Sequence, residues 1–278
     1  MLTCKNIGYL GRLGNQMFQF ASVYGISKSL GFDVKFPIEN CFNYRQDGPR
    51  NPKTGHHIPV KCDLLDCFQI PNRYFAKYHE INPKRSYSEK DFTFNPAVLS
   101  VDDFTDFFGY FQTEKYFQPY REELLDIFKF REEHISAGNK FLDQFGKSPE
   151  EMISLHVRRM DYTLYPDHHP TCSSLYYDRA LENMEGKKEV LVFSDDTEWS
   201  LTQFRDPRFH VVDLNDPYTE LYLMSKCGDN IIANSSFSWW GAWLNLNNEK
   251  KVIAPSQWFG AAMNKDTRDI YSKDWIII

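Results

Sequence analysis

The chain has 278 residues, which is enough for one large domain or two of ordinary size. Its 42% hydrophobic and 25% charged residues are ordinary for a soluble globular protein. The net charge of −6 argues against a dedicated nucleic-acid-binding protein, which usually carries a basic face, but it leaves a local basic cleft open.

The N-terminus lacks the features of a signal peptide, because Met1–Tyr9 contains no apolar segment of the required length. No apolar run approaches the roughly 18 residues of a membrane span. We therefore expect a cytoplasmic protein without a transmembrane segment. Peripheral association with the inner face of a membrane stays open.

The six cysteines are scattered through a chain that is too large to need disulfide bonds for its stability. Cys62 and Cys67, with His56 and His57 nearby, form only a loose zinc-site pattern, because no second cysteine pair follows. Buried or free thiols are the favoured interpretation.

The first elements predict a β-α-β unit. Lys5–Tyr9 has the pattern of a short strand, a glycine-rich turn follows, and a helical periodicity then runs to Gly31. Phe32–Phe36 reads as the second strand. A glycine-rich turn before a helix can bring backbone N–H groups onto an anion. The spacing matches neither a dinucleotide fingerprint nor a P-loop, so on this pattern alone a turn that simply needs glycine is favoured.

The middle of the chain is harder to organise. Residues 46–61 are rich in Pro, Gly, Asn and His and predict a long loop. A strand is expected at the start of 104–117, and helices over 116–130 and 132–145. Because 146–149 then breaks the helical pattern, we place a boundary there, between domains at 1–148 and 149–278.

The second half alternates strands and helices, which indicates a parallel, doubly wound sheet. The alternation begins with the apolar strand that contains Ile153, Leu155 and Val157, and a loop follows it over 163–174. The expected strands are 189–193, 209–213, 229–233 and 251–254, and the expected helices are 174–185, 199–204 and 218–225, with another beginning within 234–243.

Polar side chains follow three of these strands. The three groups are His156, Arg158, Arg159 and Asp161; Ser194, Asp195 and Asp196; and Asn234, Ser235, Ser236 and Ser238. Ligands of open α/β sheets bind at the carboxyl ends of the strands. Arginine binds phosphate bidentately, helix N-termini and serines hold further phosphate oxygens, and a carboxylate can accept two hydrogen bonds from guanine. Each group also has a structural explanation, as surface ion pairs or as helix N-caps; their convergence favours a nucleotide site.

The chain contains no Asp-x-Asp, the pair with which many nucleotide-sugar enzymes hold a metal ion on the diphosphate. The arginines are then the natural charge stabilisers, so we predict metal-independent chemistry with no cofactor.

Five segments in order resemble the α-1,2-fucosyltransferases of glycosyltransferase family 11, and the first and third also look like those of α-1,6- and protein O-fucosyltransferases. The segments are GRLGNQMFQ (11–19), GYFQTEKYF (109–117), HVRRMDY (156–162), FSDD (193–196) and NSSFSWWGAW (234–243). The resemblance spans almost the whole chain.

This resemblance implies a GT-B architecture, in which two Rossmann-like doubly wound domains face each other across a cleft. The domain 1–148 would lie on the acceptor side, and 149–278 would bind GDP-fucose. It also implies inverting transfer of fucose from GDP-β-L-fucose to the 2-hydroxyl of a terminal galactose. The expected partners are therefore the donor GDP-fucose and a galactose-terminated glycan.

The family's residues carry over by position. Arg158 matches the arginine on the β-phosphate, and His156 matches the histidine near the nucleoside. Arg159 is expected to pair within its domain. The remaining expected contacts are Asp195 or Asp196 on guanine, Ser235, Ser236 and the Phe237 backbone on phosphate, and Gly14 and Asn15 on a loop that closes on the diphosphate and fucose.

An inverting transfer needs a proton acceptor for the attacking hydroxyl, unless its transition state is very dissociative. Asp161, beside the arginines, is the first candidate, and Glu114 is the second. The expected catalytic set is thus Arg158, Asn15 and Asp161, although either carboxylate can instead be structural.

The chain departs from the family pattern at three positions. Arg12 and Met160 stand where glycine is common, and Asp229 where histidine is frequent. The acceptor is therefore less certain than the donor, and residues 40–100 are expected to shape the acceptor site. Transfer of fucose to another sugar or to a protein hydroxyl, and a non-catalytic glycan- or nucleotide-binding protein, are the alternatives. The sequence leaves the oligomeric state open.

Overall fold

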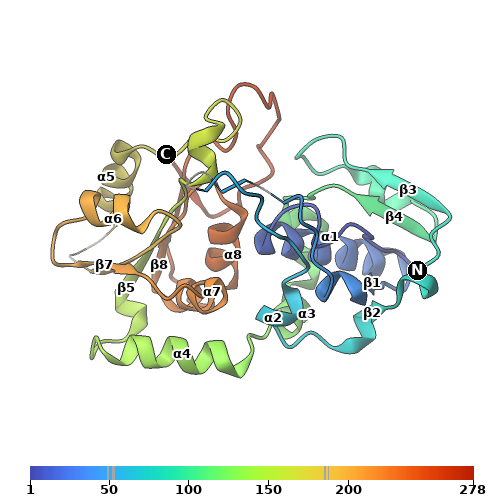
Figure 1. Ribbon diagram of the computed structural model, residues 1–278, viewed down its shortest axis with the longest axis horizontal. Coiled ribbons are helices and arrows are strands. Elements are labelled where there is room, and N and C mark those ends of the chain that lie inside the picture. Colours follow the sequence, from blue (N-terminus) through green and yellow to red (C-terminus); the bar gives the residue numbers. More distant parts are fainter. Residues whose placement is uncertain (49, 52–53, 185, 187) are drawn as a thin grey trace. The chain divides into compact units, whose positions relative to one another are not determined.

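The computed structural model describes residues 1–48, 50–51, 54–184, 186 and 188–278 (Figure 1). The chain forms two compact units. The first comprises Met1–Arg50, Gly55–Arg131 and Lys265–Ser272; the second comprises Asn51–Thr54, Glu132–Asn264 and Lys273–Ile278. No helix in the described ranges is long and apolar enough to cross a membrane.

The second unit is built on a six-stranded sheet in the order β10-β9-β8-β5-β6-β7, with all neighbouring pairs parallel. Its strands are β5 (Met152–Val157), β6 (Glu189–Ser194), β7 (Phe209–Val212), β8 (Asp229–Ile231), β9 (Val252–Ala254) and β10 (Ile276–Ile277). Its helices are α4 (Glu132–Asp143), α5 (Ser174–Glu182), α6 (Thr197–Gln203), α7 (Pro217–Lys226) and α8 (Ser236–Leu244), and the short 3-10 helices are η7 (Pro149–Glu151) and η8 (Asp161–Leu164). The predicted parallel sheet is confirmed.

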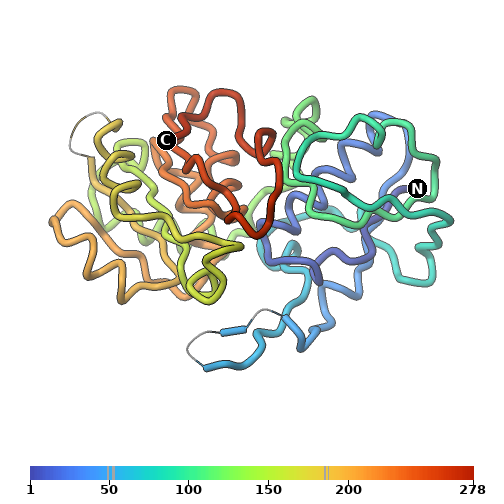
Figure 2. The backbone as a smooth tube through the Cα atoms, turned by 90° about the horizontal axis from the view of Figure 1, so that it is seen from above, coloured from blue at the N-terminus to red at the C-terminus, as the bar shows by residue number. Residues whose placement is uncertain are grey.

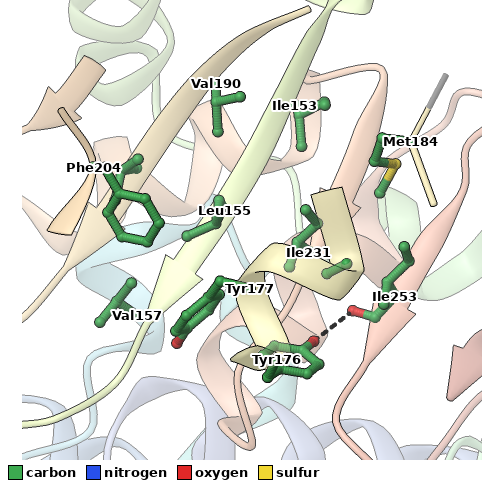
Figure 3. Close-up of a cluster of buried hydrophobic side chains, with 12 residues drawn as sticks. Ile153, Leu155, Val157, Tyr176, Tyr177, Met184, Val190, Phe204, Ile231 and Ile253 are labelled. Atoms are coloured by element: carbon green, nitrogen blue, oxygen red, sulfur yellow. Dashed lines mark hydrogen bonds between the residues drawn. The ribbon is translucent and has the colours of Figure 1, made fainter. Parts of the chain in front are cut away.

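Both faces of this sheet are covered, which explains why all six residues of β5 are buried. On one face, Ile153, Leu155 and Val157 pack with Tyr176 and Tyr177 of α5 (Figure 3). The Tyr176 hydroxyl also donates to the backbone oxygen of Ile253 at 3.2 Å, the bond dashed in Figure 3. On the other face, residues that include Met152, Leu191 and Phe193 of the sheet pack with Leu223 and Met224 of α7. The position of β5 is therefore fixed from both sides.

The first unit contains one long helix, α1 (Leu13–Leu30), and short elements around it. Its strands are β1 (Phe36–Pro37), β2 (Phe75–Ala76), β3 (Arg85–Ser88) and β4 (Thr105–Phe108). Its other helices are α2 (Leu64–Cys67), α3 (Arg121–Ile127), η1 (Ile38–Cys41), η2 (Asn72–Tyr74), η3 (Tyr78–Glu80), η4 (Pro96–Ser100), η5 (Glu114–Tyr116) and η6 (Gln118–Tyr120).

Parallel pairing runs through the first unit, although its strands are short. β1 pairs with β2, and β3 pairs with β4. Single parallel bridges join Leu2 to Val34 and Thr3 to Asp106. Helix α1 is buried along most of its length and ends at Gly31, whose φ of 71° is the left-handed conformation expected of a glycine that ends a helix.

Two predictions for the first unit are wrong. Residues 5–9 form turns, and the pairing that was expected of them is made by Leu2 and Thr3. The helix expected over 116–130 is broken into η5, η6 and the seven-residue α3. Pro119 lies in the first turn of η6, where a helix coming from η5 cannot continue through it.

The units divide at Arg131 and Glu132, ahead of the boundary expected at 148. Helix α4 belongs to the second unit, where His134 contacts Asp216 at 3.2 Å and the Tyr222 hydroxyl donates to Asn139 at 2.7 Å. Residues 265–272, in the red part of the tube in Figure 2, belong to the first unit. There Asp269 accepts from the Phe94 N–H at 2.8 Å and from Lys115 at 2.6 Å.

Candidate functional site

The three strand ends singled out in the sequence lie at one edge of the sheet. β5 pairs with β6 on one side and with β8 on the other, and all three strands are parallel. Their carboxyl ends therefore point the same way, toward the crevice in which sheets of this kind bind ligands. The polar groups after β5, β6 and β8 belong to one candidate site.

Arg158, directly after β5, is held between two carboxylates. It pairs through one terminal nitrogen with Asp195, after β6, and through the other with Asp161, in η8. Its guanidinium also lies 4.9 Å from the centre of the Tyr162 ring. Burial acts against the charged form, but Asp195 and Asp161 raise the pKa of Arg158 overall. The side chain is thus a fixed, mostly buried positive charge, with 12% of its surface exposed.

Arg159 points to different partners. Its Nε lies 3.1 Å from Asp196, and its guanidinium stacks 4.2 Å from the ring centre of Trp199. Its backbone N–H donates to Asp195 at 2.8 Å. The pairing of Arg159 within its own unit, as expected from the family pattern, is present.

Both aspartates after β6 therefore carry structural contacts. Asp195 accepts from Arg158 and from the backbone of Arg159. Asp196 is the N-cap of α6 and accepts from the Trp199 N–H at 3.3 Å. The helix-cap interpretation of Asp196 is correct. Each carboxylate keeps acceptor capacity, because a carboxylate has about four lone-pair sites.

His156 is the next-to-last residue of β5, two positions before Arg158, and is only 5% exposed. Burial, with a further effect of Arg158, lowers the pKa of His156 to about 3, so the ring is neutral near pH 7. Its centre lies 5.7 Å from that of Phe237. Within the described ranges its Nδ1 has no hydrogen-bond partner. A buried polar atom of this kind requires an explanation, and a bound ligand is one.

The segment after β8 forms a capped helix start. Ser235 is the N-cap of α8, and its hydroxyl accepts from the Phe237 N–H at 3.4 Å, while Ser236 is the first helical residue. The Asn234 amide donates to Pro170 and Trp258 carbonyls at 2.9 and 3.0 Å. The hydroxyl and N–H expected to bind phosphate thus bond to each other through a long contact, and Asn234 is a structural residue.

Sequence reasoning gave no role to Tyr162 and His169. The Tyr162 hydroxyl donates to the Asn234 backbone oxygen at 3.1 Å, and its ring stacks on His169 with centres 4.8 Å apart. Tyr162 therefore joins the Arg158 guanidinium to the segment after β8. Its place next to Asp161, at the end of the segment HVRRMDY (156–162), was the available signal.

Gly14 and Asn15 lie in the first unit, within the first turn of α1, and not on the loop that was expected. Gly11, just before the helix, has a φ of 91°, and a Cβ there would come within 2.2 Å of the Asn15 Nδ2. This glycine is therefore needed for both its conformation and its lack of a side chain. Asn15 Oδ1 accepts from Gln112 at 2.7 Å, a partner that sequence reasoning missed.

The second candidate base, Glu114, is the first residue of η5 in the first unit.

Two of the departures from the family pattern, Asp229 and Met160, lie in the second unit but at different places. Asp229 stands at the amino end of β8, where it pairs with Lys188 at 2.6 Å, so it lies at the end of the strand opposite the site. Met160 adjoins Asp161 as the N-cap of η8.

The loose zinc pattern is not assembled. Cys62 and Cys67 are fully buried, and all six cysteines are free thiols. In the part of the chain that the structure describes, no group of three or more His, Cys, Asp or Glu residues could hold a metal ion.

Comparison with known proteins identifies the family. The model of glycosyl transferase family 11 matches residues 3–278. This chain belongs to glycosyl transferase family 11. It is 31% identical over 288 residues to the O-antigen biosynthesis glycosyltransferase WbnK of Escherichia coli, covering 92% of this chain and 94% of WbnK.

Two further relatives carry more specific names. An α-1,2-colitosyltransferase of Escherichia coli is 30% identical over 267 residues, covering 90% of each chain. The galactoside α-(1,2)-fucosyltransferase 2 of the gorilla is 23% identical over 254 residues, covering 86% of this chain and 68% of the gorilla protein.

The fold of this family 11 chain is that of GT-B fucosyltransferases. The crystal structure of POFUT1 in complex with GDP matches it with a TM-score of 0.51 at 12% identity, covering 91% of this chain and 98% of POFUT1. A POFUT1 structure in complex with GDP-fucose matches with a TM-score of 0.50 at 12% identity, covering 90% and 95%. The predicted GT-B fold class is confirmed.

Proposed function

We propose that this family 11 enzyme transfers L-fucose from GDP-β-L-fucose to the 2-hydroxyl of a terminal galactose, with inversion and without a metal ion. The observation that carries the proposal is the partly buried Arg158, held between Asp195 and Asp161 at the carboxyl end of β5. The named α-1,2-transferases among its relatives support the reaction type.

Arg158 stabilises the leaving group. When the bond from fucose to the β-phosphate breaks, negative charge builds up on the phosphate. The guanidinium has five N–H donors, so the pairing of its two terminal nitrogens with Asp195 and Asp161 leaves further N–H groups for phosphate oxygens. Because the carboxylates fix its plane beforehand, little reorganisation accompanies the reaction.

The nucleoside binds beside His156. The neutral imidazole, with its buried Nδ1 unpartnered within the described ranges, suits a polar group of the nucleoside better than a phosphate. Asp195 or Asp196 accepts from guanine with its remaining lone pairs. Ser235, Ser236 and the Phe237 N–H at the start of α8 hold phosphate oxygens. On the family resemblance, Gly14 and Asn15 are further contacts of the donor.

Asp161 takes the proton from the attacking galactose hydroxyl. One of its oxygens is engaged by Arg158, and the other keeps its acceptor capacity. The ion pair with Arg158 therefore places Asp161 next to the arginine that stabilises the leaving group. Glu114 is the alternative base.

One observation favours a second donor. A relative with 30% identity over 90% of this chain is named an α-1,2-colitosyltransferase. Colitose is L-fucose without its 3-hydroxyl, so the same phosphate and guanine contacts serve either sugar. The alternatives are another sugar or a protein hydroxyl as the acceptor, and a catalytically inactive nucleotide- or glycan-binding protein. Transfer to a panel of other acceptors identifies the first, and GDP binding without turnover on any acceptor identifies the second.

The test is a donor panel with lactose as the acceptor, with and without EDTA. GDP-fucose, GDP-colitose, GDP-mannose and UDP-galactose are compared at equal concentrations. Turnover with GDP-fucose that EDTA does not reduce supports the proposal. Faster turnover with GDP-colitose than with GDP-fucose would show that GDP-colitose is the donor. Loss of turnover in EDTA, restored by a divalent cation, would overturn metal independence.

A further inference from the structure

In the segment GYFQTEKYF (109–117), only Glu114 has been given a part in the chemistry so far, yet the segment begins with a constrained turn. Gly109 has a φ of 156°, and Phe111 has a φ of 53° although it is not glycine. Phe111 is fully buried. A bulky residue in the left-handed region costs about 1–3 kcal/mol, so the surrounding contacts must hold it there.

Glu89 holds this turn from one side. One carboxylate oxygen accepts from the Tyr110 N–H at 2.6 Å, and the other accepts from the Phe111 N–H at 2.9 Å. A Cβ on Gly109 would lie 2.4 Å from the Cβ of Glu89, so the close approach requires glycine. These charge-assisted bonds fix two successive peptide groups.

Helix α1 holds the turn from the other side. Gln19 donates to the Gly109 carbonyl at 3.1 Å and to the Leu10 carbonyl at 3.0 Å. The Ser22 hydroxyl donates to the Phe111 carbonyl at 3.1 Å. One face of α1 therefore joins this turn to the glycine-rich segment that precedes the helix.

The contacts of Glu89 and of α1 with this turn fix the position of Gln112, which follows it. Its side chain is 6% exposed, and its Nε2 donates to Asn15 Oδ1 at 2.7 Å. This bond occupies the oxygen of the Asn15 amide. Asn15 itself is only partly buried, and its Nδ2 makes no hydrogen bond within the described ranges. The N–H₂ group of Asn15 is thus the half of the amide that is available to a ligand.

We infer that Gln112 is a positioning residue, which fixes the Asn15 amide with its N–H₂ group turned to the oxygens of the sugar-nucleotide donor. The inference rests on the proposed function for the role of Asn15 as a donor contact. An amide in the opposite orientation would present its oxygen to an anionic ligand and repel it. The strained turn and its double anchorage then serve to hold one orientation of one side chain.

Two nearly isosteric substitutions test the orientation. Gln112→Met keeps the volume and removes the hydrogen bond. Gln112→Glu, once ionised, can only accept, so it pulls the Asn15 N–H₂ toward itself and turns the Asn15 oxygen outward. When protonated, the glutamic acid can still donate to Asn15. We expect Gln112→Met to raise the KM for GDP-fucose about tenfold at every pH, with little change in kcat.

The pH profile separates positioning from folding. Gln112→Glu should have a nearly normal donor KM at pH 6 and a KM at pH 8.5 above that of Gln112→Met. Glu89, which faces the same turn and whose pKa is raised to about 7 by burial, acts on both variants alike. Gln118→Glu, at an exposed position of the same unit, is the charge-matched control and should retain normal kinetics. Thermal melting checks that every variant is folded.

The opposite orientation of the Asn15 amide predicts the opposite order of donor KM values for the two variants. If Gln112→Glu binds the donor better than Gln112→Met at pH 8.5, Asn15 donates to Gln112 and the inference is wrong. Normal donor KM values for both variants at all pH values also overturn it.

A measurement without turnover keeps the inference testable even if GDP-fucose is not the donor. In ¹⁵N spectra, the Gln112 and Asn15 side-chain amides are assigned by their loss in Gln112→Met and Asn15→Asp. Slow solvent exchange of the Gln112 N–H₂ with fast exchange of the Asn15 N–H₂ is expected. The reverse pattern contradicts the inference. If the unaltered enzyme shows the expected exchange pattern but no turnover, the proposed function is contradicted and the orientation of the Asn15 amide is not.

Discussion

Asp195 accepts hydrogen bonds from the guanidinium of Arg158 and, at 2.8 Å through its other oxygen, from the backbone N–H of Arg159. The carboxylate after β6 therefore holds both the side chain and the backbone that follow β5. The positive charge of Arg158 is fixed relative to the sheet edge before any ligand binds. Such preorganisation is what lets a charge stabilise a transition state in a buried site.

The first prediction concerns Arg158. Arg158→Lys keeps a positive charge but cannot bridge Asp161 and Asp195 with two parallel nitrogens. We expect kcat to fall by about 10²–10³, with a smaller increase in the KM for GDP-fucose. Steady-state kinetics and the affinity for GDP measure both effects. Transfer at the normal rate by folded Arg158→Lys and Arg158→Ala proteins would remove Arg158 from the phosphate site.

The second prediction separates the two roles of the aspartates after β6. Guanine differs from hypoxanthine by its 2-amino group, so a carboxylate that reads guanine makes the enzyme prefer GDP to IDP, by about tenfold. We expect either Asp195→Ser or Asp196→Ser to abolish this preference and the other to keep it. Titration calorimetry with both nucleotides measures it. Full preference in both variants would mean that neither aspartate reads the base.

The third prediction concerns the stability of variants at Asp196. Serine is a good N-cap, so Asp196→Ser should keep the cap of α6, whereas Asp196→Ala should lose about 1 kcal/mol of free energy of unfolding. Urea unfolding compares the two. Equal stability of both variants would show that the bond to the Trp199 N–H contributes nothing measurable.

The fourth prediction tests the base. Asp161→Asn keeps an oxygen that accepts from Arg158 but cannot take a proton. We expect kcat to fall by about 10²–10⁴, while the affinity for GDP changes only a few-fold. Glu114→Gln is measured beside it. If Glu114→Gln shows the loss and Asp161→Asn does not, the base is Glu114.

The fifth prediction follows from Glu89, a partly buried carboxylate of the first unit. Burial raises the pKa of Glu89 to about 7 from an ordinary value of 4.5. Between these values the folded protein binds more protons than the unfolded chain, so the contribution of Glu89 to stability is present below pH 4.5 and is lost as the pH rises through 7. From pH 5 to pH 8 the free energy of unfolding should fall more in the unaltered protein than in Glu89→Gln, by on the order of 2 kcal/mol. Parallel pH profiles in urea unfolding would contradict this.

The second unit could be predicted from the sequence because its strands are apolar runs separated by clear helices. A parallel sheet places the ends of such strands together, so His156, Arg158 and Asp195 could be grouped without coordinates. The ion-pair partners within this group could not be predicted, because the order of the strands does not say whether Arg158 or Arg159 faces Asp196. That choice depends on side-chain packing such as the stacking of Arg159 on Trp199.

The first unit was predicted less well because its strands have two to four residues and its sheet is joined by single bridges. Periodicity is not measurable over so few residues. The bond between Gln112 and Asn15 spans 97 positions and has no local signal at all. The positive φ values of Gly109 and Phe111, visible once the backbone is known, mark that turn as constrained.

The most direct measurement of the central claim is the structure of the product formed from GDP-fucose and lactose. NMR and methylation analysis give both the configuration of the new bond and the hydroxyl that carries it. The account predicts an α-linked fucose on the galactose 2-hydroxyl, which is inversion from the β-linked donor. Fucose on another hydroxyl, a β-linked product, or a protein that neither transfers fucose nor binds GDP would contradict it.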